Sequence, residues 1–256
     1  MRIMAYYRKI FLFLLITLSV SPSFARVNCE IFLTNRSAPH VSLWHELREN
    51  DLLVSQNSIP EKEGLCGTAC AVNIVQAALV TADLEPLSDP HSAYRTLLEF
   101  ATHSKSPFSM PTVMASIRFL LDSLYPGQKF NISGTLLKEI EGSEQNEISA
   151  VEEITQETIK PAHKKLKLLF TVQLDEYGEA IIQHAQIAIE YNGKAIALLD
   201  PNRPDIDLEA NRSEREFSIN GYPTFLFQYN DPTQIEGFWQ MVPFGVITID
   251  LSEVSK

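Results

Sequence analysis

Basic residues are scarce in this chain of 256 residues: 21 Lys and Arg stand against 32 Asp and Glu, and the formal net charge is −11. Proteins bind nucleic acids largely through Lys and Arg contacts to phosphate, so this deficit argues against nucleic acid as a partner. The same deficit argues against adhesion to anionic membranes. Net charge says little about fold, which has to be inferred from the pattern of residues.

The signatures of common cofactor and metal sites are also missing. No glycine-rich phosphate loop follows an expected strand, and no set of Cys and His residues has the spacing of zinc ligands. His40 and His45 could bind a metal in principle, but no matching carboxylate and histidine set accompanies them. We therefore expect neither a cofactor nor a metal.

The N-terminus has the pattern of a secretory signal peptide. Basic residues precede the uncharged apolar run Ile10–Val20, and the small residues Ser23 and Ala25 suit a cut after Ala25. The run is shorter than the roughly 20 residues that span a bilayer. We expect residues 1–25 to be removed and residues 26–256 to form a single exported domain, periplasmic or extracellular and free of the membrane. An uncleaved N-terminal anchor is the alternative.

Cysteine is rare, with only Cys29, Cys66 and Cys70 in the chain. An odd number of cysteines in an exported protein leaves at least one thiol unpaired or reactive. The sequence does not decide whether Cys29 and Cys70 form a disulfide.

The spacing of apolar residues predicts helices first and strands second. Periods of three and four residues predict helices over 65–82, 90–103 and 111–124. Alternating or continuous apolar segments separated by turns predict strands over 166–174, 180–191, 195–199, 217–219, 224–229 and 237–251. This order favours an α+β fold in which helices pack on an antiparallel sheet, with a helical part over about 65–125 and a sheet part over about 166–251.

Three shorter features complete this outline. Asn192-Gly193 is typical of a tight hairpin turn. Residues 26–60 indicate a mixed lead-in with a short strand, Cys29–Leu33, and a few turns. Residues 141–162 are acidic and polar and indicate a solvated excursion, in which a weak helix could follow.

Cys66 lies at the first turn of the helix expected over 65–82. Unpaired N–H groups and the helix dipole favour a thiolate there and lower the pKa of the thiol. Gly67 leaves the sulfur accessible, whereas Cys70 lies one turn deeper on the same face and is expected to pack inside. Cys66 is therefore the better nucleophile of the two. The alternative is that both are buried structural thiols.

A cysteine nucleophile needs an imidazole base and a group that orients it. Of the six histidines, only His184 lies in an expected core strand. The hairpin at Asn192-Gly193 returns the chain beside that strand, so Asp200 is expected near the level of His184. The alternative is a core histidine whose ring bonds to backbone.

Cys-Gly-Thr-Ala-Cys at 66–70, His-Ala-Gln-Ile-Ala-Ile at 184–189 and Leu-Leu-Asp-Pro-Asn at 198–202 resemble a known family. It is the bacteriocin-processing-peptidase-like (double-glycine leader peptidase-like) branch of the papain-like cysteine peptidases. The resemblance covers about 56–202. It implies a catalytic helix packed on an antiparallel sheet, with the active site in the cleft between them.

The same resemblance implies roles for individual residues. Cys66 would be the nucleophile, His184 the base and Asp200 the orienting acid, in a hydrolase that cleaves a peptide or isopeptide bond of a peptide or protein substrate through a thioester. In this family a glutamine before the cysteine helps form the oxyanion hole. Gln56 is the candidate, although it lies ten residues before Cys66, further than is usual. Asn57 is the fallback, and the Cys66 N–H is the second donor.

Two other functions remain open from the sequence. An acyl transferase on the same scaffold, phytochelatin-synthase-like or transglutaminase-like, uses Cys, His and Asp in the same order. A secreted binding protein on a degenerate peptidase fold would keep the scaffold without turnover. The Phe238-Trp239 pair in the C-terminal part could shape a substrate cleft or extend the core.

Overall fold

A computed structural model describes residues 39–59, 65–103, 106, 109–138, 147–230 and 239–254. All of them belong to one compact unit, Ser37–Lys256. The expected signal peptide, the expected strand Cys29–Leu33 and Phe238 lie outside the described residues. Among the helices of the described residues, none is long and apolar enough to cross a membrane.

In the part of the chain that the structure describes, four helices precede the main strands: α2 (Pro39–Glu49), α3 (Cys66–Thr81), α4 (Pro90–Thr102) and α5 (Met110–Leu124). The last three confirm the helices predicted over 65–82, 90–103 and 111–124. Side chains cap two of them, because Asp89 and Ser109 accept hydrogen bonds from the backbone N–H groups three residues ahead. Both helices also carry a proline in the first turn, where its missing N–H costs nothing.

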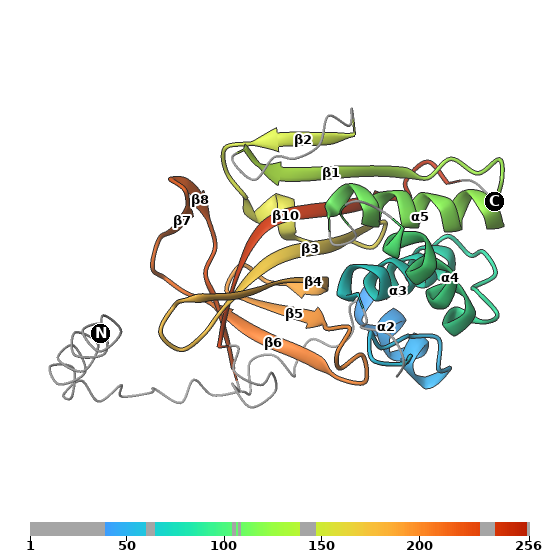
Figure 1. Cartoon of the computed structure of the whole chain (residues 1–256), viewed down its shortest axis with the longest axis horizontal. Coiled ribbons are helices and arrows are strands. Elements are labelled where there is room, and N and C mark those ends of the chain that lie inside the picture. The colour runs from blue at the N-terminus through green and yellow to red at the C-terminus, as the bar shows by residue number, and fades with distance from the viewer. Residues whose placement is uncertain are drawn as a thin grey trace, which may run out of the picture. The chain divides into compact units, whose positions relative to one another are not determined.

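The central helix is α3, which is buried without interruption from Gly67 to Leu79. A helix that is apolar on every side belongs in a core. Here α3 contacts α2, α4 and α5 as well as strands of the sheet, and Figure 1 shows these helices gathered against one end of the strands. Gly67 permits the close approach of α5, because a Cβ atom there would lie 2.7 Å from Val113 Cγ2.

The strand predicted at Cys29–Leu33 lies outside the described residues, but the lead-in over 26–60, for which no helix was predicted, contains one. Pro39–Glu49 forms α2, whose Leu43, Trp44 and Leu47 are all buried. These three residues share one helical face, since they are spaced one and then three residues apart. That short apolar stripe was the signal for a helix.

The described residues contain ten strands, which form two sheets. The first has eight strands in the order β2-β1-β10-β3-β4-β5-β6-β9, and a further pairing of β9 with β10 closes six of them into a barrel. The second contains only β7 and β8. The strands are β1 (Asn131–Leu137), β2 (Ile148–Val151), β3 (Lys165–Leu174), β4 (Ala180–Tyr191), β5 (Ala195–Leu199), β6 (Asp207–Arg212), β7 (Phe217–Ile219), β8 (Tyr222–Thr224), β9 (Phe227–Tyr229) and β10 (Gln240–Asp250).

The architecture is therefore mixed helix and sheet, compatible with the predicted α+β class, although the sheet closes into a barrel. Every pairing is antiparallel except that of β1 with β2. The sequence analysis missed β1, β2 and β6 and predicted one strand over 224–229 where β8 and β9 are separate. In the acidic stretch 141–162, the described residues carry the short helix α6 (Gln156–Ile159), in keeping with the weak helix expected there, and also β2, which was not expected.

The predicted hairpin joins β4 to β5. Gly193 has a φ of +89°, and the side-chain oxygen of Asn192 accepts hydrogen bonds from the N–H groups of Lys194 and Ala195. The register pairs Tyr191 with Ile196 and Ile187 with Leu199. Asp200 directly follows β5 and therefore lies beside the part of β4 that carries His184. The register of this hairpin thus places the carboxylate next to the histidine.

Candidate active site

Cys66 is the first residue of α3, and Leu65 before it has extended backbone geometry. The N–H groups of a first helical turn have no partner within the helix and create a positive local field. The side chain of Cys66 is partly accessible and forms a hydrogen bond with the side chain of His184. The structure thus brings together the two residues that the sequence analysis predicted as nucleophile and base.

Several groups set the charge of the Cys66 sulfur. Burial alone would raise the pKa of the thiol, but the hydrogen bond and charge of His184 act in the opposite direction. The backbone groups of Ala185 and Gly67 also hydrogen-bond to the sulfur, and the resulting pKa lies below its ordinary value. Cys66 is therefore prepared to ionise more readily than a free cysteine.

His184 is buried on β4, and its Nε2 lies 2.8 Å from Oδ2 of Asp200. A carboxylate can only accept, so Nε2 carries the proton and Nδ1 is left to face Cys66. Burial favours the neutral ring, yet the charge and hydrogen bond of Asp200, joined by those of Cys66, raise the pKa of His184. Sulfur and ring therefore favour the thiolate–imidazolium form.

Asp200 is 1% exposed, and donors surround its carboxylate. Oδ2 accepts from His184 and, at 2.7 Å, from Nε2 of Gln186, while Oδ1 accepts from the Asn202 N–H at 2.8 Å. Burial would raise the pKa of Asp200, but the charge and hydrogen bonds of these partners lower it. The acid that the sequence placed near His184 is thus held in its ionised form.

Cys70 lies one turn further along α3 and is fully buried. Its Sγ donates to the carbonyl oxygen of Ala185 at 3.3 Å. Burial, followed by the negative charges of Cys66 and Asp200, raises the pKa of Cys70 well above its ordinary value. Cys70 is therefore a neutral packing thiol, in keeping with its predicted inward position.

Gln56, the predicted oxyanion donor, forms backbone hydrogen bonds with Pro201, which follows Asp200, and with Tyr94 of α4. Its N–H donates to the Pro201 carbonyl at 2.8 Å, and its carbonyl accepts from the Tyr94 hydroxyl at 2.9 Å. The Tyr94 oxygen in turn receives a backbone hydrogen bond from Leu65, next to Cys66. This chain of contacts brings Gln56 to the site, while the use of its side-chain amide as an oxyanion donor stays a prediction.

The fallback donor, Asn57, is exposed and donates to the Asn202 side chain at 3.4 Å. Of the remaining histidines, His45 is exposed and pairs with Glu49 at 3.4 Å, and His103 bonds to the Glu99 carbonyl. In the described part of the chain, no group of three or more His, Cys, Asp and Glu residues is arranged to hold a metal ion.

Sequence reasoning missed a polar cluster behind Asp200, formed by Gln186, Tyr229 and Gln173. Gln173 lies on β3, opposite Ile182 of β4. Gln186 follows His184 by two residues and so shares its face of β4. That spacing was a usable signal for Gln186, whereas Tyr229 reaches the cluster only because the barrel closes.

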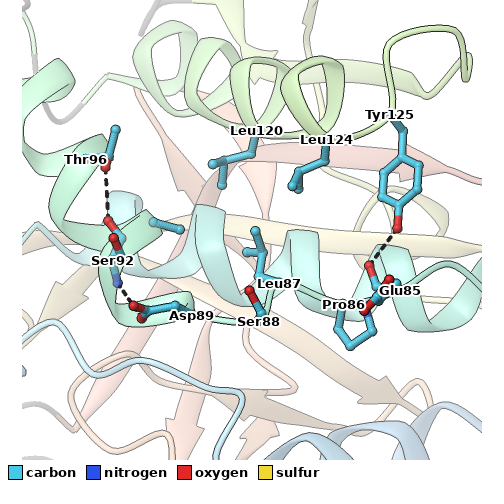
Figure 2. A pocket seen from close by; sticks show the side chains of 11 residues that line it. Glu85, Pro86, Leu87, Ser88, Asp89, Ser92, Thr96, Leu120, Leu124 and Tyr125 are labelled. Atoms are coloured by element: carbon cyan, nitrogen blue, oxygen red, sulfur yellow. Dashed lines mark hydrogen bonds between the residues drawn. The ribbon is translucent and has the colours of Figure 1, made fainter.

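A separate groove of about 630 Å³ lies among the helices. Figure 2 shows its walls, which come from the Glu85–Asp89 loop, the start of α4 and the end of α5 with Tyr125. The Tyr125 hydroxyl donates to the Glu85 carbonyl at 2.8 Å. None of the predicted site residues lines this groove, so it is separate from the candidate site.

Comparison with models of protein families, with curated proteins and with solved structures gives no match for this chain. The geometry of Cys66, His184 and Asp200 is therefore the main indication of what this chain does.

Proposed function

We propose that this protein is an exported thiol hydrolase of the papain-like type, which cleaves a peptide or isopeptide bond through a thioester intermediate. One observation carries the proposal: a cysteine at a helix N-terminus hydrogen-bonds to an imidazole, whose other nitrogen bonds to a buried carboxylate. A nucleophile, a base and an orienting acid that contact one another in this order are the groups that covalent acyl transfer requires.

Each group has a defined task in the proposed reaction. The Cys66 thiolate attacks the substrate carbonyl carbon, and the Cys66 N–H and the Gln56 amide stabilise the resulting oxyanion. The His184 imidazolium gives its Nδ1 proton to the leaving amine, which departs as the carbon–nitrogen bond breaks. The neutral ring then takes a proton from water, whose oxygen attacks the thioester, and the acid product leaves the regenerated thiolate.

The chain offers a matched pair of variants for the test. Cys66→Ala and Cys70→Ala remove the same atoms from the same helix, one turn apart. With a mixture of activated peptide substrates, we expect the first variant to lose all turnover and the second to retain most of it. Intact-mass spectrometry of the wild-type protein should also detect an acyl adduct on Cys66.

Turnover that survives Cys66→Ala would refute the proposal. Adding glutathione or an amine acceptor to the same assay separates hydrolysis from transfer, because only a transferase converts the acceptor into an acylated product.

A further inference from the structure

Gln186 is a buried polar side chain that the proposed mechanism does not use. It is 0% exposed, and its Nε2 lies 2.7 Å from Asp200 Oδ2, the same oxygen that binds His184. Nε2 also lies 3.4 Å from the Tyr229 hydroxyl, which accepts from Gln173 Nε2 at 3.2 Å. The carboxylate therefore has an amide–phenol–amide chain behind it.

The orientation of the Gln186 amide is dictated by Asp200. A carboxylate accepts hydrogen bonds and cannot donate, so the NH₂ group must face it. The Gln186 Oε1 atom is then left buried and accepts no hydrogen bond from any described residue. A buried acceptor without a donor destabilises a fold. Packing alone would favour an apolar side chain here, so the amide serves Asp200.

We infer that Gln186 is a positioning residue that holds the Asp200 carboxylate ionised and aimed at His184, and thereby activates Cys66. This inference rests on the proposed function. Gln186 acts through Asp200 and touches neither the sulfur nor the substrate carbonyl.

The titratable groups that face Asp200 and His184 in the described residues are Tyr229 from β9 and the thiols of Cys66 and Cys70 from α3. Burial and the charge of Asp200 raise the pKa of Tyr229 against its hydrogen bonds, so the phenol stays neutral. Cys70 is likewise neutral. Near neutral pH, the charged members of this group are therefore Cys66, His184 and Asp200. Gln186 does not titrate, but its hydrogen bond favours the ionised form of Asp200.

The test uses Gln186→Met, which keeps the side-chain length and removes the donor. Loss of this hydrogen bond should raise the pKa of Asp200 and release its carboxylate from alignment with His184. The weaker contact between Asp200 and the ring should then lower the pKa of His184 and raise that of Cys66. The rate of Cys66 alkylation by iodoacetamide rises with pH as the thiol ionises, and we expect this rise to move up by about one pH unit in the variant. At a fixed pH within the rise, labelling should be about tenfold slower. Thermal stability should stay equal or rise.

Gln173→Met is the matched control, because it makes the same change in a buried glutamine one step further from Asp200. Its alkylation profile should stay at the wild-type position. If Gln186→Met does not fold, Gln186→Asn withdraws the amide by one carbon and should shift the rise in the same direction.

Two outcomes would overturn the inference: a wild-type profile in the folded Gln186 variant, or an equal shift in Gln173→Met. The proposed function fails separately. If wild-type Cys66 shows no alkylation below the pH range of an ordinary thiol, the ion pair itself is absent, whatever Gln186 does.

Discussion

Cys66 and Cys70 stand one helical turn apart on α3 and have opposite properties. The first is partly accessible and its pKa is lowered, whereas the second is sealed in the core and its pKa is raised. Both contact Ala185 of β4: the Cys66 sulfur hydrogen-bonds to the backbone of this residue, and Cys70 donates to its carbonyl. The position at the helix end and the imidazole partner account for the lowered pKa of Cys66, because Cys70 is the same residue type and lacks both.

The largest expected effect is the difference in labelling between the two thiols. At mildly acidic pH, iodoacetamide should modify Cys66 about 1,000-fold faster than Cys70, because Cys66 is ionised and accessible. Residue-resolved mass spectrometry of native and denatured protein measures the ratio, which should collapse towards one after denaturation. Equal labelling of both thiols in the native protein would remove the contrast.

His184→Ala should abolish most of that difference. The ring supplies the hydrogen bond and charge that counter burial, so without it the pKa of Cys66 rises. Thiolate would then form only as the pH rises through the range of an ordinary thiol or above, and labelling near pH 6 should fall by about 100-fold. His45→Ala removes an exposed ring and is the control. An unchanged alkylation rate in His184→Ala would show that the helix end alone activates the sulfur.

Asp200→Asn should have a smaller effect in the same direction. The amide keeps the shape of the side chain but removes the charge that raises the pKa of His184. The imidazolium is then lost at lower pH and Cys66 ionises at higher pH, so labelling at a fixed pH within the rise should slow by about tenfold. Asp205→Asn, on the exposed loop beyond, is the matched control and should behave as wild type.

Cys70→Ala should give the smallest change, and in stability rather than reactivity. Removing a fully buried sulfur leaves a small cavity and frees the Ala185 carbonyl, which should cost about 1–2 kcal/mol of unfolding free energy. Chemical denaturation measures this loss, and the alkylation profile of Cys66 should stay unchanged. A large shift of that profile would mean that Cys70 contributes to activation through Ala185.

The sequence predicted the parts of this molecule whose signal is local. Helix α3 has an apolar period, the β4–β5 hairpin has its Asn-Gly turn, and together they brought Cys66, His184 and Asp200 within reach of prediction. The turn itself differs in detail, because the positive φ falls on Gly193 while Asn192 uses its side chain as a cap. A second pair, Asn220-Gly221, has positive φ at both residues.

The features that were missed depend on contacts between distant segments. β2 is half exposed on both faces, so it has no alternating pattern and is defined only by pairing with β1. β6 offers only Leu208 and Ala210 as buried apolar residues. Barrel closure depends on two residue pairs between β9 and β10, which no local pattern reveals. Tyr229 reaches Gln186 through that closure, so the polar support of Asp200 was invisible in the sequence.

Among the described strands, β10, which completes the sheet, comes last in sequence order. β10 pairs with β1, β3 and β9, so each of these three strands lacks one pairing partner until β10 has been synthesised. The strand that carries His184 pairs with β3, and β3 gains its second neighbour only from β10, so we expect the ring of His184 and the sulfur of Cys66 to meet late in folding. We therefore expect the Cys66 thiol of a nascent chain to become reactive only after β10 has paired with its neighbours.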